Sequence, residues 1–291
     1  MAEKIYLTEC PRDAMQGWPD FIPTETKVSY LNCLLKVGFD TLDFGSFVSP
    51  KAIPQMRDTA DVLKQLDLTS TQTDLLAIIA NFRGAEDAAS FDEIKYLGFP
   101  FSISEEFQRR NTNSTISESL VRVQEIQDLC LRRKKELLIY ISMGFGNPYG
   151  EPWNAEIVIH WVKKLADMGI KHIALADTVG VSNPENIRHL FSHLIPEIKS
   201  VRFGAHLHSA PATWKEKVIA ASESGCTRFD SALKGIGGCP MAEDELVGNL
   251  ATENLVEYFG GPEKSGLNAG NFQSALRMAN DVFQSRSTQH F

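Results

Sequence analysis

The feature that most constrains the fold of this chain is a repeated alternation of a short β-rich run with an amphipathic helical stretch. It predicts eight strands, at Ile5–Glu9, Thr41–Phe44, Thr69–Leu76, Phe99–Ile103, Leu137–Ser142, His172–Asp177, Val201–His206 and Arg228–Ser231. Helices are expected after the strands, at Glu25–Val37, Ile53–Leu66, Ala85–Ile94, Ile116–Arg133, Asn154–Met168, Pro184–Ile195, Pro211–Ser224 and Glu243–Phe259. Strands joined by right-handed helical crossovers run parallel, and eight such units close naturally into a (β/α)8 TIM barrel of the α/β class.

The alternative α/β fold is an open, doubly wound sheet. That fold favours a Gly-rich phosphate-binding turn after its first strand, and Cys10-Pro11-Arg12-Asp13 is not such a turn. No compositional break marks a domain boundary, so we predict a single catalytic domain over residues 1–291. The tail, residues 262–291, is expected to add one extra C-terminal helix near Asn271–Phe283, packed outside the barrel.

Charge and cysteine content narrow the function classes. The formal net charge of -8 argues against a general binder of nucleic acid. No run approaches the roughly 20 apolar residues that a membrane span needs, and the strand-like run from Ile5 begins too early for a signal peptide. The five cysteines form no CxxC pair, which makes a disulfide framework or structural zinc site unexpected and favours a reducing, cytoplasmic location.

Polar residues follow several of the predicted strands at their carboxyl ends. In a barrel these ends meet at one mouth, where the loops carry the chemistry. The residues gathered there are Arg12, Asp13, Asp43, Ser46, Asp177, Thr178, His206, His208 and Cys239.

The pair His206-Leu207-His208 is the most informative of these features. Side chains two residues apart on a strand point to the same face, so both imidazoles can bind one metal ion. The alternative is one hydrogen-bonded core histidine and one surface histidine. Asp13 is the carboxylate best placed to complete the metal site, although an ion pair with Arg12 would also explain it. Two histidines and one carboxylate leave iron conceivable, whereas magnesium or manganese would serve a chelating hydroxy acid.

A glycine-rich loop, Gly235-Ile236-Gly237-Gly238-Cys239-Pro240, follows the eighth predicted strand. Such a loop can bend sharply and bring the Cys239 thiol close to a ligand. A structural turn with an incidental cysteine is the alternative. Cys10, beside Arg12 and Asp13, is a rival thiol, which we favour less because it lies at the end of a strand without a mobile loop.

These motifs resemble those of the 3-hydroxy-3-methylglutaryl-CoA lyase family, a group of DRE-type TIM-barrel metallolyases. Six blocks match in the family's order over nearly the whole chain. They are Pro11-Arg12-Asp13-Ala14-Met15-Gln16, Gly45-Ser46-Phe47-Val48-Ser49-Pro50-Lys51 with Pro54-Gln55-Met56, Asp177-Thr178-Val179-Gly180-Val181, His206-Leu207-His208, the Gly235–Pro240 loop, and Gly248-Asn249-Leu250-Ala251-Thr252-Glu253.

The resemblance implies a divalent metal, Mg²⁺ or Mn²⁺, held by four side chains, which are Asp13, His206, His208 and Asn249. Only the resemblance selects Asn249, because on composition alone it would be a surface amide of a helix. The resemblance further implies that Arg12 binds the thioester carbonyl of an acyl-CoA substrate and that Cys239 is the catalytic thiol. Asp177 or His206 is the expected general base.

Asp43 and Ser46 are expected to bind substrate. The resemblance also implies cleavage of 3-hydroxy-3-methylglutaryl-CoA to acetyl-CoA and acetoacetate, and a homodimer. No nucleic-acid or membrane partner is expected.

The chain departs from the family pattern at positions that surround the site. The family usually carries Glu where this chain has Asp43, Asp where it has Ser209, and Tyr where it has Met241. After the first motif, Gly17-Trp18-Pro19-Asp20 replaces the usual Asn-Glu-Lys. These changes leave the acyl group open to a related 3-hydroxyacyl-CoA.

Three other functions compete with the lyase. Claisen condensation of the isopropylmalate or homocitrate synthase type usually requires C-terminal additions for which 291 residues leave no room. An aldolase acting on a non-CoA hydroxy acid would use the same metal set. A catalytically silent barrel that only binds or regulates would be expected to have a broken ligand or thiol set, which this sequence does not show.

Overall fold

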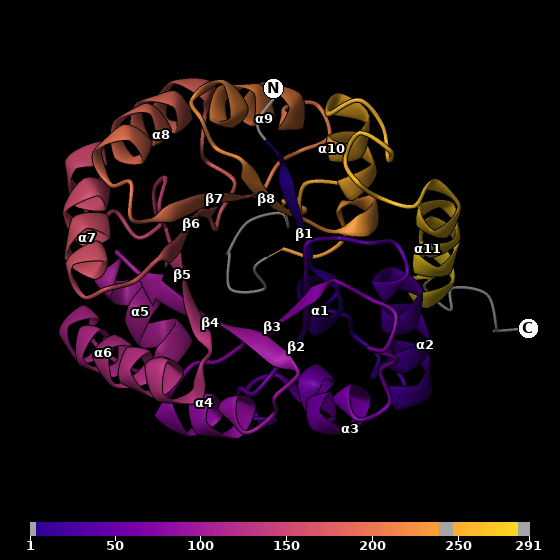
Figure 1. The fold of residues 1–291 in the computed structure, drawn as a ribbon. Coiled ribbons are helices and arrows are strands. Elements are labelled where there is room, and N and C mark those ends of the chain that lie inside the picture. The colour runs from indigo at the N-terminus through magenta and orange to yellow at the C-terminus, as the bar shows by residue number, and fades with distance from the viewer. Residues whose placement is uncertain (1–3, 239–246, 285–291) are drawn as a thin grey trace, which may run out of the picture.

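Eight parallel strands pair in sequence order and the last pairs with the first, which closes the barrel of Figure 1 and confirms the predicted TIM-barrel fold. The structure is a computed structural model that describes residues 4–238 and 247–284. The strands are β1 (Tyr6–Glu9), β2 (Thr41–Ser46), β3 (Asp74–Ile78), β4 (Ile94–Ser102), β5 (Glu136–Ser142), β6 (His172–Asp177), β7 (Arg202–Leu207) and β8 (Arg228–Ser231).

Helices form a ring around the strands (Figure 1). Their bounds are α1 (Pro11–Gln16), α2 (Thr24–Leu35), α3 (Thr59–Leu63), α4 (Phe82–Ala89), α5 (Glu105–Thr112), α6 (Ile116–Arg133), α7 (Ala155–Asp167), α8 (Pro184–Glu197), α9 (Trp214–Glu223), α10 (Thr252–Tyr258) and α11 (Ala269–Val282), with short 3₁₀ turns at Pro54–Met56 and Leu233–Gly235. None of these helices is both long and apolar enough to cross a membrane.

Side-chain alternation along the strands separates two packed regions. On β7, Phe203, Ala205 and Leu207 join the large core between strands and helices. Residues of the opposite parity face the barrel interior, where Leu138 and Ala174 belong to a second, smaller cluster. The same parity rule decides which polar side chains reach the mouth of the barrel.

The predicted C-terminal helix is present as α11, which lies beside α2 on the outside of the barrel (Figure 1). Phe283, just beyond α11, packs edge-on against Trp18 and Tyr30, with ring centroids 5.4 and 5.9 Å apart. Aromatic contacts of this kind attach the tail to the first βα unit.

Several predicted boundaries were wrong for local reasons. The strand expected from Thr69 begins at Asp74, because the Thr69 backbone N–H and hydroxyl both bond to Asp67 in a turn. The strand expected from Phe99 begins at Ile94. Its Gly98 and Pro100 are residues that strand propensity disfavours.

Helical predictions also need correction. The helix expected over Ile53–Leu66 is broken into a 3₁₀ turn and α3, and the helix expected from Pro211 begins at Trp214. The helix expected over Glu243–Phe259 is helical only from Thr252 onward among the described residues. Two short helices, α1 and α5, were missed. The capping residue Ser104, whose hydroxyl accepts a hydrogen bond from the Phe107 N–H at 3.1 Å, is a signal that could have revealed α5.

Candidate active site

The two histidines lie at the carboxyl end of β7. His206 faces the barrel interior, and His208 follows the strand and pairs with Asn249 in an isolated bridge. Leu207 between them points to the outer core, so both imidazoles line the same cavity of about 450 Å³, with ring centroids 5.2 Å apart. The two-residue spacing therefore acts as the strand geometry predicts.

Arg12 and Asp13 lie on α1, which begins at Pro11, directly after the end of β1. Proline favours the first position of a helix because its backbone dihedral φ is already helical. Both side chains reach the cavity that the histidines line. Candidate ligand atoms of Asp13, His206 and His208 all lie within 4.8 Å of one another, close enough to share one ion. The short helix α1 therefore places Arg12 and Asp13 beside the histidines.

The Arg12 guanidinium is held from several sides. Its Nη2 and Nε donate to Asp43 at 2.6 and 3.0 Å, and its Nη1 donates to Gln16 at 2.8 Å and to Asp13 at 3.2 Å. Burial would lower the pKa of Arg12, but Asp43 and Asp13 keep the pKa above its ordinary value. Arg12 is therefore a fixed, permanent positive charge at the edge of the cavity.

Asp13 and Asp43 share this single guanidinium, which leaves local negative charge in excess. Burial would raise the pKa of Asp13, but the nearby Arg12 and histidines, together with a hydrogen bond from Asn249, hold it below its usual range. Burial raises the pKa of Asp43 to about 6, despite its contacts with Arg12. A divalent cation beside Asp13 would compensate this charge.

His208 presents a lone pair to the cavity. Its Nδ1 lies 3.2 Å from the carbonyl oxygen of Thr178, which can only accept, so Nδ1 carries the proton. Burial and the neighbouring His206 lower the pKa of His208 to about 4, which keeps the ring neutral at pH 7. Its Nε2 is buried and has no hydrogen-bond partner among residues 4–238 and 247–284. A neutral imidazole with a free buried nitrogen suits a metal ligand.

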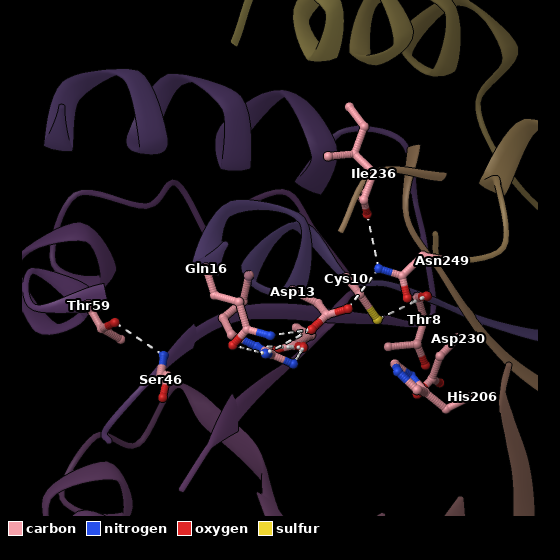
Figure 2. Close-up of polar contacts among 12 residues, drawn as sticks. Thr8, Cys10, Asp13, Gln16, Ser46, Thr59, His206, Asp230, Ile236 and Asn249 are labelled. Atoms are coloured by element: carbon pink, nitrogen blue, oxygen red, sulfur yellow. Dashed lines mark hydrogen bonds and ion pairs between the residues drawn. The ribbon is translucent and has the colours of Figure 1, made fainter. Parts of the chain in front are cut away.

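His206 is oriented by Asp230, a residue that the sequence analysis missed. Its Nδ1 lies 3.3 Å from Asp230 Oδ2, and the two residues are register partners of β7 and β8 (Figure 2). Burial would lower the pKa of His206, but Asp230 raises it above its ordinary value. An acidic residue inside the predicted strand Arg228–Ser231, on the opposite face from Phe229, was the signal that could have identified Asp230.

Asn249 is buried at the site and lies outside any helix, which excludes a surface role. Its side-chain nitrogen donates to Asp13 Oδ2 at 2.7 Å and to the Ile236 carbonyl at 3.0 Å (Figure 2). Asn249 therefore orients the Asp13 carboxylate in this structure.

Glycine is required where the loop after β8 crosses the site. Gly237 has a φ of +99°, and a Cβ there would lie 2.7 Å from Asn249 Nδ2 and 2.9 Å from the Asp13 carbonyl. The segment that leads to Cys239 therefore starts in close contact with Asp13 and Asn249. Cys239 itself lies outside the described residues. The rival thiol Cys10 is buried, and its Sγ lies 3.8 Å from the Thr8 carbonyl.

Asp177 does not line the cavity, because it follows the inward-facing Ala176 on β6. Its Oδ2 accepts from the Ser182 backbone N–H at 3.1 Å and from Lys217 Nζ at 2.9 Å. Lys217, on α9, also donates to the His208 carbonyl at 2.9 Å. The geometry therefore favours a positioning role for Asp177 over the general-base role expected from the sequence.

Ser46 lies apart from the Asp13 group, beside Thr59 (Figure 2). Its hydroxyl accepts from the Val48 N–H at 3.2 Å, and it lines a second cavity of about 380 Å³. Asp43 also does not line the first cavity. It lies behind Arg12 and accepts hydrogen bonds from the guanidinium. Of the three predicted substrate-binding residues, Arg12 therefore shares the cavity of the metal candidates, whereas Asp43 and Ser46 do not line it.

Comparisons with known proteins match both the sequence and the barrel fold of this chain. The HMGL-like family model matches residues 5–278. A hydroxymethylglutaryl-CoA lyase of Bacillus subtilis is 33% identical over 255 residues, 87% of this chain and 84% of that protein. The (R)-citramalyl-CoA lyase of Chloroflexus aurantiacus is 32% identical over 283 residues, 93% of this chain and 87% of that protein. A solved structure of an HMG-CoA lyase from Acinetobacter baumannii, in complex with coenzyme A and 3-methylmalate, has a TM-score of 0.87 and 28% identity over 99% of this chain and 97% of that chain. This chain belongs to the HMGL-like family.

Proposed function

We propose that this protein is a metal-dependent carbon–carbon lyase that cleaves 3-hydroxy-3-methylglutaryl-CoA, or a close 3-hydroxyacyl-CoA, to acetyl-CoA and a carbonyl compound. The observation that carries the proposal is the shared cavity of Arg12, Asp13, His206 and His208 at the carboxyl ends of the strands. The relatives named above act on coenzyme A thioesters of this kind, as their names state.

Asp13, His206 and His208 are the residues that would hold Mg²⁺ or Mn²⁺, with Asn249 as the fourth candidate. The free Nε2 of His208 and the excess of carboxylate around Arg12 both fit a bound cation. When bound, such an ion polarises the oxygens of a hydroxy acid and lowers the pKa of the 3-hydroxyl group. Asp230 and Asn249 hold His206 and Asp13 in position for it.

Arg12 would stabilise the charge that develops on the thioester. Cleavage of the C2–C3 bond leaves an electron pair on C2, which delocalises onto the thioester oxygen as an enolate. A guanidinium already fixed by Asp43 and Gln16 needs little reorganisation to meet that charge. The Cys239 thiol would then supply the proton to C2.

Removal of the hydroxyl proton requires a base in the cavity. Of the two expected candidates, His206 lines the cavity, whereas Asp177 is bound by Ser182 and Lys217. We therefore assign to Asp177 the positioning of β6 against α9. His206 is the base candidate in the cavity, but its Nδ1 faces Asp230, so its Nε2 can take the proton only when Asp13, His208 and Asn249 hold the ion without it.

The carbonyl product of cleavage distinguishes between the candidate acyl groups of the substrate. The 32% identity to a citramalyl-CoA lyase makes citramalyl-CoA the second candidate substrate. Cleavage of 3-hydroxy-3-methylglutaryl-CoA yields acetoacetate and acetyl-CoA, and the same bond cleavage in citramalyl-CoA yields pyruvate and acetyl-CoA. The purified protein with Mg²⁺ or Mn²⁺ is therefore assayed against both thioesters by mass spectrometry of the products. If neither thioester is cleaved at any metal concentration, the lyase proposal is refuted.

Arg12→Gln tests the role of the guanidinium. Loss of one preorganised oxyanion partner lowers kcat by about 10²- to 10³-fold, whereas Mn²⁺ affinity measured by electron paramagnetic resonance is expected to stay near that of the wild type. A variant that keeps full turnover contradicts enolate stabilisation by Arg12. Incubation with acetyl-CoA and a 2-oxo acid tests the competing Claisen reaction, which would release free coenzyme A.

A further inference from the structure

A third cavity, which is polar and has a volume of about 390 Å³, opens at the opposite end of the barrel from the proposed active site. Its lining includes the first residue of six strands, such as Tyr6 of β1, His172 of β6 and Arg228 of β8. We call this cavity the N-terminal mouth. It shares no lining residue with the cavity that contains Arg12 and Asp13 among the residues described.

The N-terminal mouth is cationic although the whole chain carries a net charge of -8. Four basic side chains line it against two carboxylates, those of Asp40 and Asp74. Lys4 pairs with Asp40 at 2.6 Å and Lys95 pairs with Asp74 at 2.7 Å. Both carboxylates are therefore paired with lysines. Of the two arginines of the cavity, Arg228 is paired with Asp230 at 2.9 Å, which leaves Arg202 as the surplus positive charge.

The surplus cation, Arg202, lies at the rim. Its guanidinium stacks 4.6 Å from the centre of the Tyr6 ring. Within residues 4–238 and 247–284 no carboxylate lies in ion-pair distance of Arg202. A guanidinium that is stacked but not paired keeps its fork of N–H donors available.

The second arginine, Arg228, lies at the inner end of the cavity and is 8% exposed. Its Nη2 donates to Thr8 Oγ1 at 3.1 Å and lies 2.9 Å from Asp230 Oδ1. Its Nη1 is buried and has no hydrogen-bond partner in the described part of the chain. Gly204 makes this placement possible, because a Cβ there would lie 2.7 Å from Nη1.

A buried guanidinium donor without a partner is unfavourable unless a ligand or water accepts its hydrogen bond. Thr8 and Asp230 hold Arg228 in one orientation, so its remaining donor is preorganised. We propose that the N-terminal mouth binds a small oxyanion of the phosphate type, which Arg228 contacts at the inner end and Arg202 at the rim. The guanidinium of Arg202, unpaired among the described residues, and the remaining Nη1 donor of Arg228 suit the several acceptor oxygens of a tetrahedral oxyanion.

Calorimetric titration with inorganic phosphate tests this proposal. The full-length protein is titrated at fixed ionic strength, balanced with chloride, with and without saturating coenzyme A. Saturable binding of one equivalent is expected under both conditions. Binding that is absent, or that disappears when coenzyme A is present, overturns the proposal, the latter because it would place the phosphate in the other cavity.

Rim variants locate the bound anion. Arg202→Gln is expected to weaken phosphate binding about fivefold, and Arg202→Gln combined with Lys95→Gln by more. Arg188→Gln removes the same charge from the outer surface of α8 and is the matched control, for which affinity within about twofold of the wild type is expected. Equal affinities for the wild type and Arg202→Gln would overturn the proposal.

One further variant and one further ligand extend the test. Arg228→Met removes the inner donor and is expected to abolish saturable binding, and circular dichroism verifies that the variant is folded. If Arg228→Met does not fold, the Arg202→Gln and Lys95→Gln variants decide whether phosphate binds at the N-terminal mouth. Titration with glycerol 3-phosphate separates the two sources of the anion, because tighter binding than inorganic phosphate identifies a phosphate ester as the preferred ligand and weaker binding identifies the free ion.

Discussion

Glu9 provides a stability prediction that can be worked out from the structure. It ends β1, is fully buried, and joins the two sides of the loop that leads from β8 to α10. Its Oε1 accepts from the Leu233 N–H at 2.8 Å and its Oε2 accepts from Thr252 Oγ1 at 2.5 Å. That loop carries both Cys239 and Asn249, so Glu9 supports the proposed active site.

Burial raises the pKa of Glu9 from 4.5 to about 8, despite the hydrogen bonds from Thr252 and Leu233. Between these values the folded state keeps a proton that the unfolded state has lost. The free energy of unfolding therefore falls as pH rises, with the Glu9 contribution intact below pH 4.5 and lost above about pH 8. At about 1.4 kcal/mol per pKa unit, the shift corresponds to about 5 kcal/mol as an upper limit.

Glu9→Gln mimics the protonated side chain at every pH. Its amide oxygen can still accept from Leu233, and its amide group can donate to the Thr252 hydroxyl. We expect the variant and the wild type to unfold at similar urea concentrations near pH 5. The variant should become progressively more stable than the wild type up to about pH 8 and keep that advantage at pH 9. Urea unfolding followed by circular dichroism measures this difference.

Glu257→Gln, at an exposed position of α10, is the matched control and is expected to show no such trend. A stability difference between Glu9→Gln and the wild type that stays constant from pH 5 to pH 9 would refute the argument. That result would mean that Glu9 is ionised in the folded protein throughout this range.

Three other variants test the surroundings of the proposed metal site. Lys217→Met leaves Asp177 buried without its cation and is expected to lower the free energy of unfolding by about 3–5 kcal/mol, measured by urea unfolding. A loss below about 1 kcal/mol would show that the pair has little structural role. Asp230→Asn is expected to weaken Mn²⁺ binding about 10- to 100-fold in a paramagnetic resonance titration, and unchanged affinity would contradict the orienting role of Asp230. Mn²⁺ should raise the Tm of the wild type and EDTA should reverse the increase, whereas Asp13→Asn should lose this response; an equal response of the variant would exclude Asp13 as a ligand.

The sequence alone determined the barrel and the location of its chemistry. Alternating β-rich and helical runs specify parallel strands, and the barrel then collects residues such as Asp13, His206 and His208 at one mouth although they lie far apart in the chain. The spacing of His206 and His208 was sufficient to place both rings in one cavity, because side-chain parity along a strand is a local property.

Only the tertiary structure decided what each polar side chain contacts. Asp177 and His206 both lie near strand ends in the sequence, yet Asp177 turns outward to Lys217 while His206 faces the cavity. Asp230 and Arg228 orient groups that belong to neighbouring strands, through pairings that exist only after the barrel closes. Local patterns fix the periodicity of a chain, whereas buried polar partners depend on contacts between distant segments, which one sequence read in isolation does not specify.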